Sequence, residues 1–306
     1  MKILLAGGTG FLGVPLVESL LQERHDVVVL TRRAAAVSPN ARVRFVQWAP
    51  DAQTGIWPAE LDGADVIVNL AGEPIAAKRW SNRQKQQILD SRVHATRRLT
   101  QAMATAARPP SVFISGSAVG YYGPLADEIV TEETPAGSDF LASVCVKWEA
   151  EAERASGPRT RVVCVRTGLV LEKDGGALSK MLLPFKLGAG GPVGSGRQYW
   201  PWIHRRDWID LVRWAMTTPS CSGPINAVAP NPVTNAEFAS ALGHAIHRPA
   251  FMPTPAFALR LMLGEMADAL LLSGQRAVPA KAQSLWFTFR YARVDHALRA
   301  IFSGAE

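Results

Sequence analysis

The sequence predicts an α/β protein with a doubly wound parallel sheet, and three observations lead to this fold class. Short apolar runs of strand length alternate with segments of helical spacing over residues 1–170 of the 306-residue chain. The first apolar run leads directly into a glycine-rich turn, and a helical segment follows at once. Beyond residue 170 the composition changes. We therefore expect a main domain over residues 1–170 and a smaller C-terminal α/β lobe over residues 171–306, some of whose elements return to the main sheet.

The first turn has the pattern of a dinucleotide site of the Rossmann type. A strand is expected over residues 3–6 and a helix over residues 14–22, with four glycines between them. Gly7 can adopt a positive φ, Gly10 lets the backbone approach a pyrophosphate, and Gly13 lets the helix pack closely on the strand. The start of the helix offers free N–H groups to phosphates. The alternative is an ordinary strand–helix turn. The expected contacts in this turn are Gly7, Thr9, Gly10, Phe11, Leu12 and Gly13.

The end of the second expected strand, residues 26–32, indicates which nicotinamide cofactor is bound. An acid at this point holds the ribose 2′-hydroxyl, whereas an arginine accommodates a 2′-phosphate. This chain has Thr31, Arg32 and Arg33 and no acid after Val29, about 20 residues beyond the glycines. We therefore predict NADP(H), with Thr31 and Arg32 at its adenosine end. The alternative is that both arginines are simply solvated.

Four more strands and two long helices complete the expected main domain. The strands are residues 43–47, 65–72, 111–117 and 160–166, and the helices are residues 81–107 and 141–155. Ser81 is expected to cap the long helix at its N-terminus, and Pro109 and Pro110 to end it. One strand finishes in small and polar residues at the carboxyl edge, where ligands bind in such sheets. The expected cofactor contacts there are Asn69, Leu70, Ala71 and Gly72.

The C-terminal lobe begins with a glycine-rich stretch, residues 188–196, and an aromatic stretch, residues 199–204. A helix is expected over residues 207–216 and a strand over residues 225–229, and helices fill much of residues 235–272. We expect this lobe to close over the edge of the cofactor site.

The composition is that of a soluble globular protein, with 48% hydrophobic and 19% charged residues. The net charge of +7 comes from scattered basic residues, so no nucleic-acid partner is expected. The apolar stretch 257–272 contains Arg260, Glu265 and Asp268, which predicts a packed helix and no membrane span. Three cysteines without a C-x-x-C pair indicate reduced thiols, and no signal peptide is recognisable. We therefore expect a cytoplasmic protein.

Several motifs together resemble the extended short-chain dehydrogenase/reductase superfamily. They are Gly7-Gly-Thr-Gly-Phe-Leu-Gly13, Asn69-Leu-Ala-Gly72, Ser115-Gly-Ser117 with Tyr121-Tyr122-Gly123, and Arg166-Thr-Gly168. Other stretches are similar to its atypical, nucleoside-diphosphate-sugar epimerase-like (YfcH-type) family. They are Gly194-Ser-Gly-Arg-Gln198, Trp200-Pro-Trp-Ile-His204, Asp139-Phe-Leu-Ala142 and Trp148-Glu149. The resemblance implies a Rossmann domain with NADP(H) and a C-terminal lobe for a small-molecule substrate. It also allows a homodimer, because extended relatives often dimerise through two Rossmann helices.

The catalytic pattern of that superfamily is incomplete in this chain. Extended members exchange a proton through a Tyr-x-x-x-Lys pair while hydride moves. One register of the 141–155 helix places Ser143 and Lys147 at the two positions, which gives a lysine without a tyrosine. The other register places Leu141 and Cys145 there, which gives neither. Lys147 is therefore a candidate for the nicotinamide ribose, and a solvated lysine is the alternative.

The remaining candidates lie on both sides of the fifth expected strand. Arg92 stands where the superfamily has an asparagine, and Ser115 lies in the strand, so both are expected beside the cofactor. Ser117 stands where the superfamily serine is expected. Tyr121 or Tyr122, on the following loop, could replace the missing acid or base. The alternative is that the tyrosines pack as walls over cofactor or substrate.

Polar and aromatic side chains of the C-terminal lobe are the substrate-binding candidates, because they suit a polar or anionic group beside an apolar wall. They are Arg197, Gln198, Trp200, Trp202 and His204. For the tryptophans the alternative is a place in the core. His204 falls with Asp207 at the start of an expected helix, which favours a capping and orienting role over a catalytic one.

No metal site is expected. His244 and His247 have the spacing of one helix face, but no third ligand lies nearby in sequence. Glu132 and Glu133 are interpreted as part of a polar loop. The sequence thus predicts an NADP(H)-dependent oxidoreductase or epimerase-like enzyme acting on a small polar substrate of unknown identity. The alternative is a non-catalytic NADP(H)-sensing protein, because the superfamily tyrosine is absent.

Overall fold

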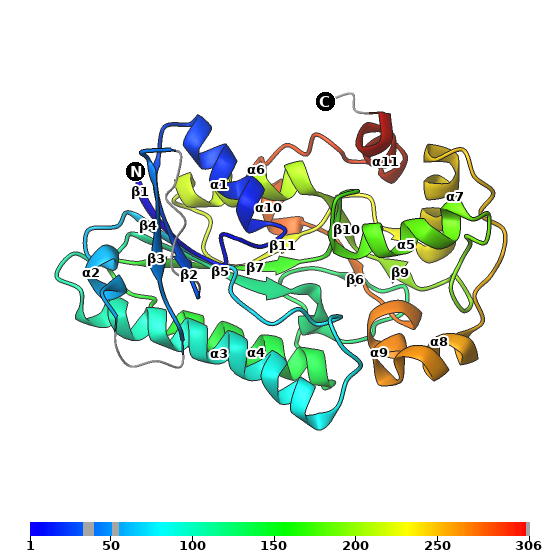
Figure 1. Cartoon of the computed structure of the whole chain (residues 1–306), viewed down its shortest axis with the longest axis horizontal. Coiled ribbons are helices and arrows are strands. Elements are labelled where there is room, and N and C mark those ends of the chain that lie inside the picture. Colours follow the sequence, from blue (N-terminus) through cyan, green and yellow to red (C-terminus); the bar gives the residue numbers. More distant parts are fainter. Residues whose placement is uncertain (33–39, 51–54, 304–306) are drawn as a thin grey trace.

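The main body of the protein is a seven-stranded parallel sheet with the strand order β11-β7-β5-β4-β1-β2-β3 (Figure 1). The computed structural model describes residues 1–32, 40–50 and 55–303. The strands are β1 (Lys2–Ala6), β2 (Asp26–Thr31), β3 (Val43–Gln47), β4 (Val66–Asn69), β5 (Val112–Ala118), β7 (Arg161–Thr167) and β11 (Gly223–Ala227). Every neighbouring pair is parallel. The predicted doubly wound α/β class is therefore confirmed.

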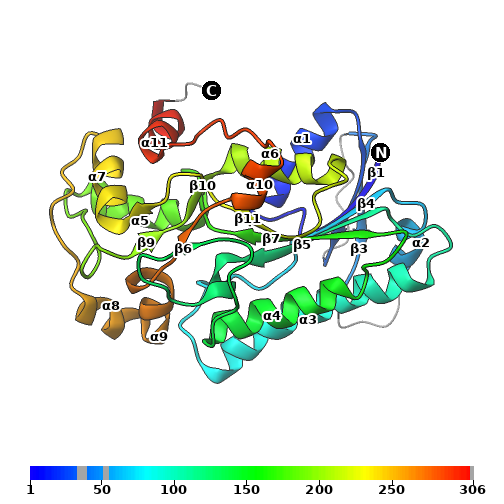
Figure 2. The same ribbon diagram turned by 180° about the vertical axis from the view of Figure 1, so that it is seen from behind.

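Helices cover both faces of this sheet (Figures 1 and 2). One face carries α3 (Asn82–Thr105) and α4 (Phe140–Glu153), and the other carries α1 (Gly13–Gln22), α6 (Arg205–Thr217) and α10 (Ala280–Ser284). The strands are apolar on both sides for this reason. In β1, for example, Ile3 and Leu5 belong to the core under α1 and α6, whereas Leu4 and Ala6 belong to the core over α3 and α4.

Side-chain caps fix where the long helices begin. The Ser81 hydroxyl accepts a hydrogen bond from the N–H of Gln84 at 3.2 Å, so the predicted cap of α3 is confirmed. The Asp139 carboxylate caps α4 by accepting from the N–H of Ala142 at 2.9 Å. A short helix, α2 (Trp57–Leu61), lies outside the expected elements.

The C-terminal lobe has its own core, which is built mainly on α5 (Gly176–Lys186), α7 (Asn235–Ala245) and α11 (Val294–Ser303). Short two-stranded pairs join it: β8 (Leu169–Leu171) with β10 (Trp202–His204), and β9 (Tyr199–Trp200) with β12 (Val233–Thr234). A third pair joins β6 (Ile129–Val130) to β13 (Arg276–Ala277). The remaining short elements are the 3-10 turn η1 (Val119–Tyr122), α8 (Ala256–Leu263), α9 (Glu265–Ala267) and the π-helical turn η2 (Asp268–Leu272).

The chain enters the C-terminal lobe after β7 and then returns to the main sheet. β11 pairs with β7 from Gly223 opposite Val163 to Ala227 opposite Thr167. A return of this kind was expected, although the strand occupies residues 223–227 instead of 225–229. Helices α5, α10 and α11 were not anticipated from the sequence. Within the described ranges, no helix has both the length and the apolar character that a bilayer span requires.

Candidate functional site

The glycine turn after β1 has the backbone geometry that its sequence predicts. Gly7 has a φ of +84°, and a Cβ there would lie 2.7 Å from the carbonyl carbon of Leu70. A Cβ on Gly13 would overlap the carbonyl oxygen of Gly7. Both positions therefore require glycine, one for the left-handed turn and the other for the close approach of α1 to the turn.

The N-terminus of α1 is open toward the carboxyl edge of the sheet. Its N-cap residue, Leu12, provides no side-chain hydrogen bond to the first turn of the helix. Thr9 and Gly10 are exposed, and a Cβ on Gly10 would meet only the Gly7 carbonyl oxygen, at 3.3 Å. Free amides at a helix start attract anions, so this turn fits a pyrophosphate. Phe11 closes one side, since its ring packs on the 175–176 loop and lies 5.3 Å from the Arg205 guanidinium.

The neighbouring strand β4 forms the other side of this turn. Asn69 is fully buried: its amide donates to the Thr96 hydroxyl at 2.9 Å, and its side-chain oxygen accepts from the N–H of Ala71 at 3.2 Å. The N–H of Leu70 donates to the carbonyl of Ala6 at 2.8 Å. These bonds hold the segment that ends at Gly72 directly against the glycine turn.

Strand β2 brings the candidate adenosine residues to the same edge. Ala6 pairs with Leu30, so Gly7, the first residue after β1, lies beside Thr31, the last residue of β2. Thr31 is half-buried and Arg32, just beyond the strand, is exposed. Arg33 lies outside the described residues.

Arg92 reaches this region from α3 but is held by backbone carbonyls. Its guanidinium donates to the carbonyls of Glu73 at 2.9 Å and Ile88 at 3.0 Å, and it lies 5.2 Å from the Trp148 ring. Burial lowers the pKa of Arg92. A Cβ on Gly72 would lie 3.1 Å from this guanidinium, so Arg92 supports the loop that follows β4.

A buried ion pair lies at the carboxyl ends of β5 and β7. The Arg166 side chain is 3% exposed and donates two hydrogen bonds to the Glu149 carboxylate, at 2.9 and 2.8 Å. It also donates to the Tyr122 hydroxyl at 3.0 Å and to the Glu132 carbonyl at 3.2 Å. Burial opposes the charge on Arg166, but the hydrogen bonds and charge of Glu149 outweigh it and raise the pKa of this arginine.

Two of the catalytic candidates belong to this ion-pair network. The Ser117 hydroxyl donates to Glu149 at 2.6 Å. The Tyr122 side chain is buried, its hydroxyl donates to the Asn226 side-chain oxygen at 2.7 Å, and burial raises its pKa to about 12. Both hydroxyl protons are thus directed at protein acceptors. Ser115 is also buried, and its hydroxyl lies 3.3 Å from the Gly116 carbonyl.

Tyr121 differs from its neighbour. Its ring is half-buried and lies over the Arg166 guanidinium, 3.5 Å from the ring centroid, with its edge against Tyr122. In the part of the chain that the structure describes, its hydroxyl has no hydrogen-bond partner. Of the three hydroxyl candidates, Tyr121 alone has an uncommitted proton.

The structure places Lys147 on the exposed side of α4, which is the alternative given for it. Cys145 faces β5, with its thiol 3.7 Å from the Ala118 carbonyl, and burial raises its pKa to about 11. Leu141 lies against Gly120, so the register with Leu141 and Cys145 is the one that faces the strand ends. Lys147 is two residues further along the helix and therefore points to the opposite, exposed side with Ser143. No Tyr–Lys pair is formed.

The substrate candidates of the C-terminal lobe are mostly buried. Trp200 and Trp202 are 7% and 1% exposed and belong to the core of the lobe, which is the alternative role for these residues. The Gln198 amide donates to the carbonyls of Val193 at 3.1 Å and Leu271 at 2.8 Å. Arg197 is exposed. Trp200, Trp202 and Gln198 thus contact the lobe itself.

His204 is the N-cap of α6, as its position suggested. Its Nδ1 accepts from the N–H of Arg206 at 3.0 Å, and its ring stacks on Tyr291 with centroids 3.9 Å apart. Burial, together with Arg205 and Arg290, lowers the pKa of His204 to about 4. His204 is therefore a neutral, buried residue that orients the chain at the start of α6.

Sequence reasoning missed the partners that complete the buried network. Glu132, interpreted as part of a polar loop, is 8% exposed and accepts from the N–H groups of Asn226 at 2.9 Å and Lys281 at 3.2 Å. Glu149 and Arg166 stand in the recognised motifs but were given no role. Arg166 itself could have indicated this network. It is a charged residue at the end of an apolar strand, and a buried charge requires a partner.

No metal centre is formed within the described ranges, where no three acidic, histidine or cysteine side chains converge. His244 lies in the last turn of α7, and His247 lies beyond the helix with a φ of +54°, so the two do not share a helix face.

Comparisons with known proteins agree with this geometry. Residues 3–227 match the NAD dependent epimerase/dehydratase family, and residues 254–301 match a domain of unknown function, DUF1731. The chain is 40% identical over 303 residues to the Arabidopsis thaliana protein "Epimerase family protein SDR39U1 homolog, chloroplastic", covering 98% of this chain and 86% of the relative. It is 38% identical over 305 residues to "Epimerase family protein YfhF" of Bacillus subtilis, covering 99% and 98%.

A solved structure covers almost the same length. The human epimerase family protein SDR39U1, crystallised with NADPH, superimposes with a TM-score of 0.88 at 35% identity and 99% coverage of both chains. The chain described here therefore belongs to the NAD dependent epimerase/dehydratase family, among epimerase family proteins of the SDR39U1 and YfhF type that carry a C-terminal DUF1731 domain.

Proposed function

We propose that this protein binds NADP(H) at the glycine turn and acts as an oxidoreductase or epimerase-like enzyme on a small polar substrate. The observation that carries the proposal is the turn itself. Gly7, Gly10 and Gly13 leave a backbone cradle at an uncapped helix start, and the end of β4 lies beside it. Such a cradle binds a pyrophosphate through backbone amides and the helix dipole.

The residues present fit a phosphorylated nicotinamide dinucleotide. The pyrophosphate would lie against Gly10, Phe11 and Leu12, and the exposed Arg32 would pair with a 2′-phosphate. The human relative that crystallised with NADPH supports this choice. When bound, NADP(H) supplies or accepts a hydride.

Tyr121 is the residue that we propose to exchange the proton. Ser117 and Tyr122 already direct their protons at Glu149 and Asn226. The Tyr121 ring is fixed by its stacking on the buried Arg166, whereas its hydroxyl remains without a described partner. It lies directly after β5, at the carboxyl edge of the sheet, where a substrate beside the cofactor would be placed.

The cofactor assignment is tested with two substitutions at one position. Arg32→Ala and Arg32→Asp should weaken NADPH binding at least tenfold and leave NADH binding much less affected, because one charge-assisted contact to the 2′-phosphate is lost. Arg159→Ala is the matched control, because Arg159 is an exposed arginine before β7, at the opposite edge of the sheet. Isothermal titration with both dinucleotides measures the effect. An unchanged preference in both Arg32 variants would remove the 2′-phosphate role.

The reaction is tested without knowing the substrate. The protein is incubated with a metabolite extract and NADPH deuterated at the transferable C4 position, and products are analysed by mass spectrometry. A labelled metabolite absent from the protein-free control would establish net hydride transfer. The absence of any label, with tight cofactor binding retained, would contradict a net oxidoreductase.

A second candidate is a non-catalytic NADP(H)-sensing protein. It is favoured by one observation, the exposed position of Lys147, which leaves α4 without a Tyr–Lys pair at the strand ends. Under this reading, substitution of Tyr121 would change neither NADPH binding nor any turnover. The cytoplasmic location, the homodimer and the absence of a nucleic-acid partner stay predictions.

A further inference from the structure

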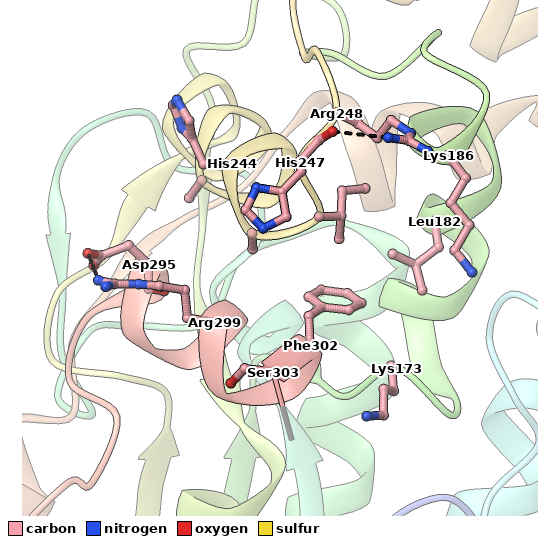
Figure 3. A pocket seen from close by; sticks show the side chains of 13 residues that line it. Lys173, Leu182, Lys186, His244, His247, Arg248, Asp295, Arg299, Phe302 and Ser303 are labelled. Carbon is pink, nitrogen blue, oxygen red and sulfur yellow. Dashed lines mark hydrogen bonds and ion pairs between the residues drawn. The ribbon is translucent and has the colours of Figure 1, made fainter. Parts of the chain in front are cut away.

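A large cavity lies in the C-terminal lobe, away from the glycine turn. It has a volume of about 1140 Å³ and opens between α5, α7 and α11 (Figure 3). All residues that line it lie at position 173 or later in the sequence, and none belongs to the glycine turn or to a strand of the seven-stranded sheet. Ligand sites in proteins commonly have a few hundred to about 1,000 Å³, which makes this cavity large enough for a small molecule.

Cationic side chains surround the cavity. Lys173, Lys186, Arg248 and Arg299 line it, and Asp295 is the one acidic residue among the lining residues described. Asp295 is already paired, since its carboxylate accepts from Arg299 at 3.0 Å and from Arg293 at 3.1 Å. Among the described residues, the ammonium groups of Lys173 and Lys186 have no hydrogen-bond or ion-pair partner.

Helix dipoles offset only part of this positive charge. The last described turns of α5, α7 and α11 all line the cavity, and each helix C-terminus contributes about half a negative charge. Four cations and one carboxylate leave a formal charge of +3 with both histidines neutral. The cavity thus stays positive after roughly 1.5 charges from the helix ends are subtracted.

The floor of the cavity is apolar. Leu182 is buried, and Ile246 and Phe302 are half-buried, between the cationic side chains. A positively charged rim around an apolar floor suits a ligand that carries an anionic group on an apolar body. In Figure 3, Lys186 and Arg248 lie at one end of the cavity and Lys173 lies at the other, below Phe302. Several cations around one cavity favour a doubly charged phosphate over a single carboxylate.

His247 adds an independent observation. It occupies the left-handed position that ends α7, where the N–H of Arg248 donates to Gly243 at 2.9 Å and the N–H of His247 donates to His244 at 3.2 Å. Glycine is the usual residue at this position, because a side chain there costs about 1 kcal/mol. In Figure 3 the His247 ring points into the cavity between α7 and Phe302. The end of α7 thereby places an imidazole, which can donate a hydrogen bond to an anion, at the cavity.

We propose that this cavity is a binding site for an organic phosphate, that is, a phosphate ester of an apolar alcohol. Lys186 and Arg248 bind the phosphate, and His247 donates to it. Lys173 adds positive charge at the other end of the cavity, and Leu182 and Phe302 contact the apolar body. The site is separate from the dinucleotide turn, so the two can be filled at the same time.

The test uses 1-naphthyl phosphate and the full chain saturated with NADPH, which keeps the probe out of the glycine turn. Titration followed by protein NMR or calorimetry should show saturable binding with a Kd below about 1 mM. Inorganic phosphate and 1-naphthol should each bind at least tenfold more weakly, because each lacks half of the recognised chemistry.

Two variants locate the binding. Lys173→Glu with Lys186→Glu, and separately His247→Gly, should weaken the probe at least tenfold and leave NADPH binding unchanged. Arg159→Glu, a charge reversal outside both sites, should bind the probe like the parent chain. His247→Gly also relieves the backbone strain, so it keeps the test valid if the double variant fails to fold. Undiminished probe binding in His247→Gly and the lysine variant, equally tight 1-naphthol, or no saturable binding to the parent chain would each overturn the proposal.

Discussion

At the residue scale, Arg166 contacts two adjacent tyrosines in different ways. Arg166 donates a hydrogen bond to the Tyr122 hydroxyl at 3.0 Å and stacks under the Tyr121 ring at 3.5 Å. Tyr122 is therefore tied at its hydroxyl, and Tyr121 is tied at its ring face. Only the second arrangement leaves a phenol group available for a substrate. This contrast is the reason for assigning the proton exchange to Tyr121.

The assignment predicts opposite effects for two conservative substitutions. Tyr121→Phe should lower kcat by roughly 10²–10⁴ and leave the NADPH dissociation constant unchanged, because it removes only the proton. Tyr122→Phe should mainly lower the free energy of unfolding, by about 1–3 kcal/mol, because Asn226 and Arg166 lose a buried partner. Turnover of the labelled metabolite and urea unfolding measure the two effects. A full kcat in Tyr121→Phe would assign the proton to another group.

The residues that could be predicted from sequence are those whose role depends on nearby backbone. Gly7 and Gly13 were predicted correctly because a tight turn between a strand and a helix demands them within seven residues. The Glu149–Arg166 pair joins a helix to a strand 17 residues away, and spacing alone gives no such contact. Lys147 was suggested by the spacing of the superfamily motif. Its position along α4 places it on the exposed side of the helix.

At the scale of elements, the contact between β1 and α1 sets the shape of the cofactor turn. The helix approaches so closely that no side chain fits at Gly13, and its start is left uncapped by Leu12. Packing and anion binding thus depend on the same few backbone atoms. Secondary structure here followed from the sequence because the apolar run and the glycines are both local signals. Helices α5 and α11 were not predicted. Helix α5 contains Pro184, which disfavours a helix, and the stretch before α11 has no clear signal for a helix start.

A single added methyl group tests that contact. In Gly13→Ala the new Cβ would overlap the Gly7 carbonyl, so α1 must shift away from the turn. We expect a loss of about 1–3 kcal/mol in the free energy of unfolding and weaker NADPH binding. Gly157→Ala is the control, since a Cβ there meets nothing within 4 Å. Denaturant unfolding and dinucleotide titration of both variants measure the difference, and equal behaviour would mean that the turn tolerates a side chain.

At the scale of the whole molecule, the segment around His204 joins the main sheet to the C-terminal lobe. His204 ends β10, caps α6 and stacks on Tyr291, whereas Asp207 in the first turn of α6 accepts from the N–H groups of Arg290 at 2.9 Å and Tyr291 at 2.8 Å. The sequence suggested the cap, since capping is local. The contact with Tyr291 lies 87 positions away and follows only from the tertiary fold.

This junction should make stability depend on pH. The pKa of His204 falls to about 4 in the folded chain, from 6.5 in the unfolded chain, so below pH 6.5 only the unfolded chain takes up the proton. Stability is therefore fully present above pH 6.5 and is lost as the pH falls toward 4, by roughly 3 kcal/mol at most. His204→Asn keeps a capping oxygen but does not titrate. Thermal unfolding across this window should show a shallower pH dependence in the variant, and parallel curves would assign the dependence elsewhere.

The return of β11 to the main sheet has a consequence for synthesis on the ribosome. Until residue 227 has emerged, β7 is an edge strand with unpaired backbone groups, and such edges invite pairing with other chains. About 60 residues separate the ends of β7 and β11. At 5–20 residues per second this leaves the nascent sheet open for roughly 3–12 s. The N-terminal portion of this protein is thus exposed to mispairing or to chaperones until the C-terminal portion is already being made.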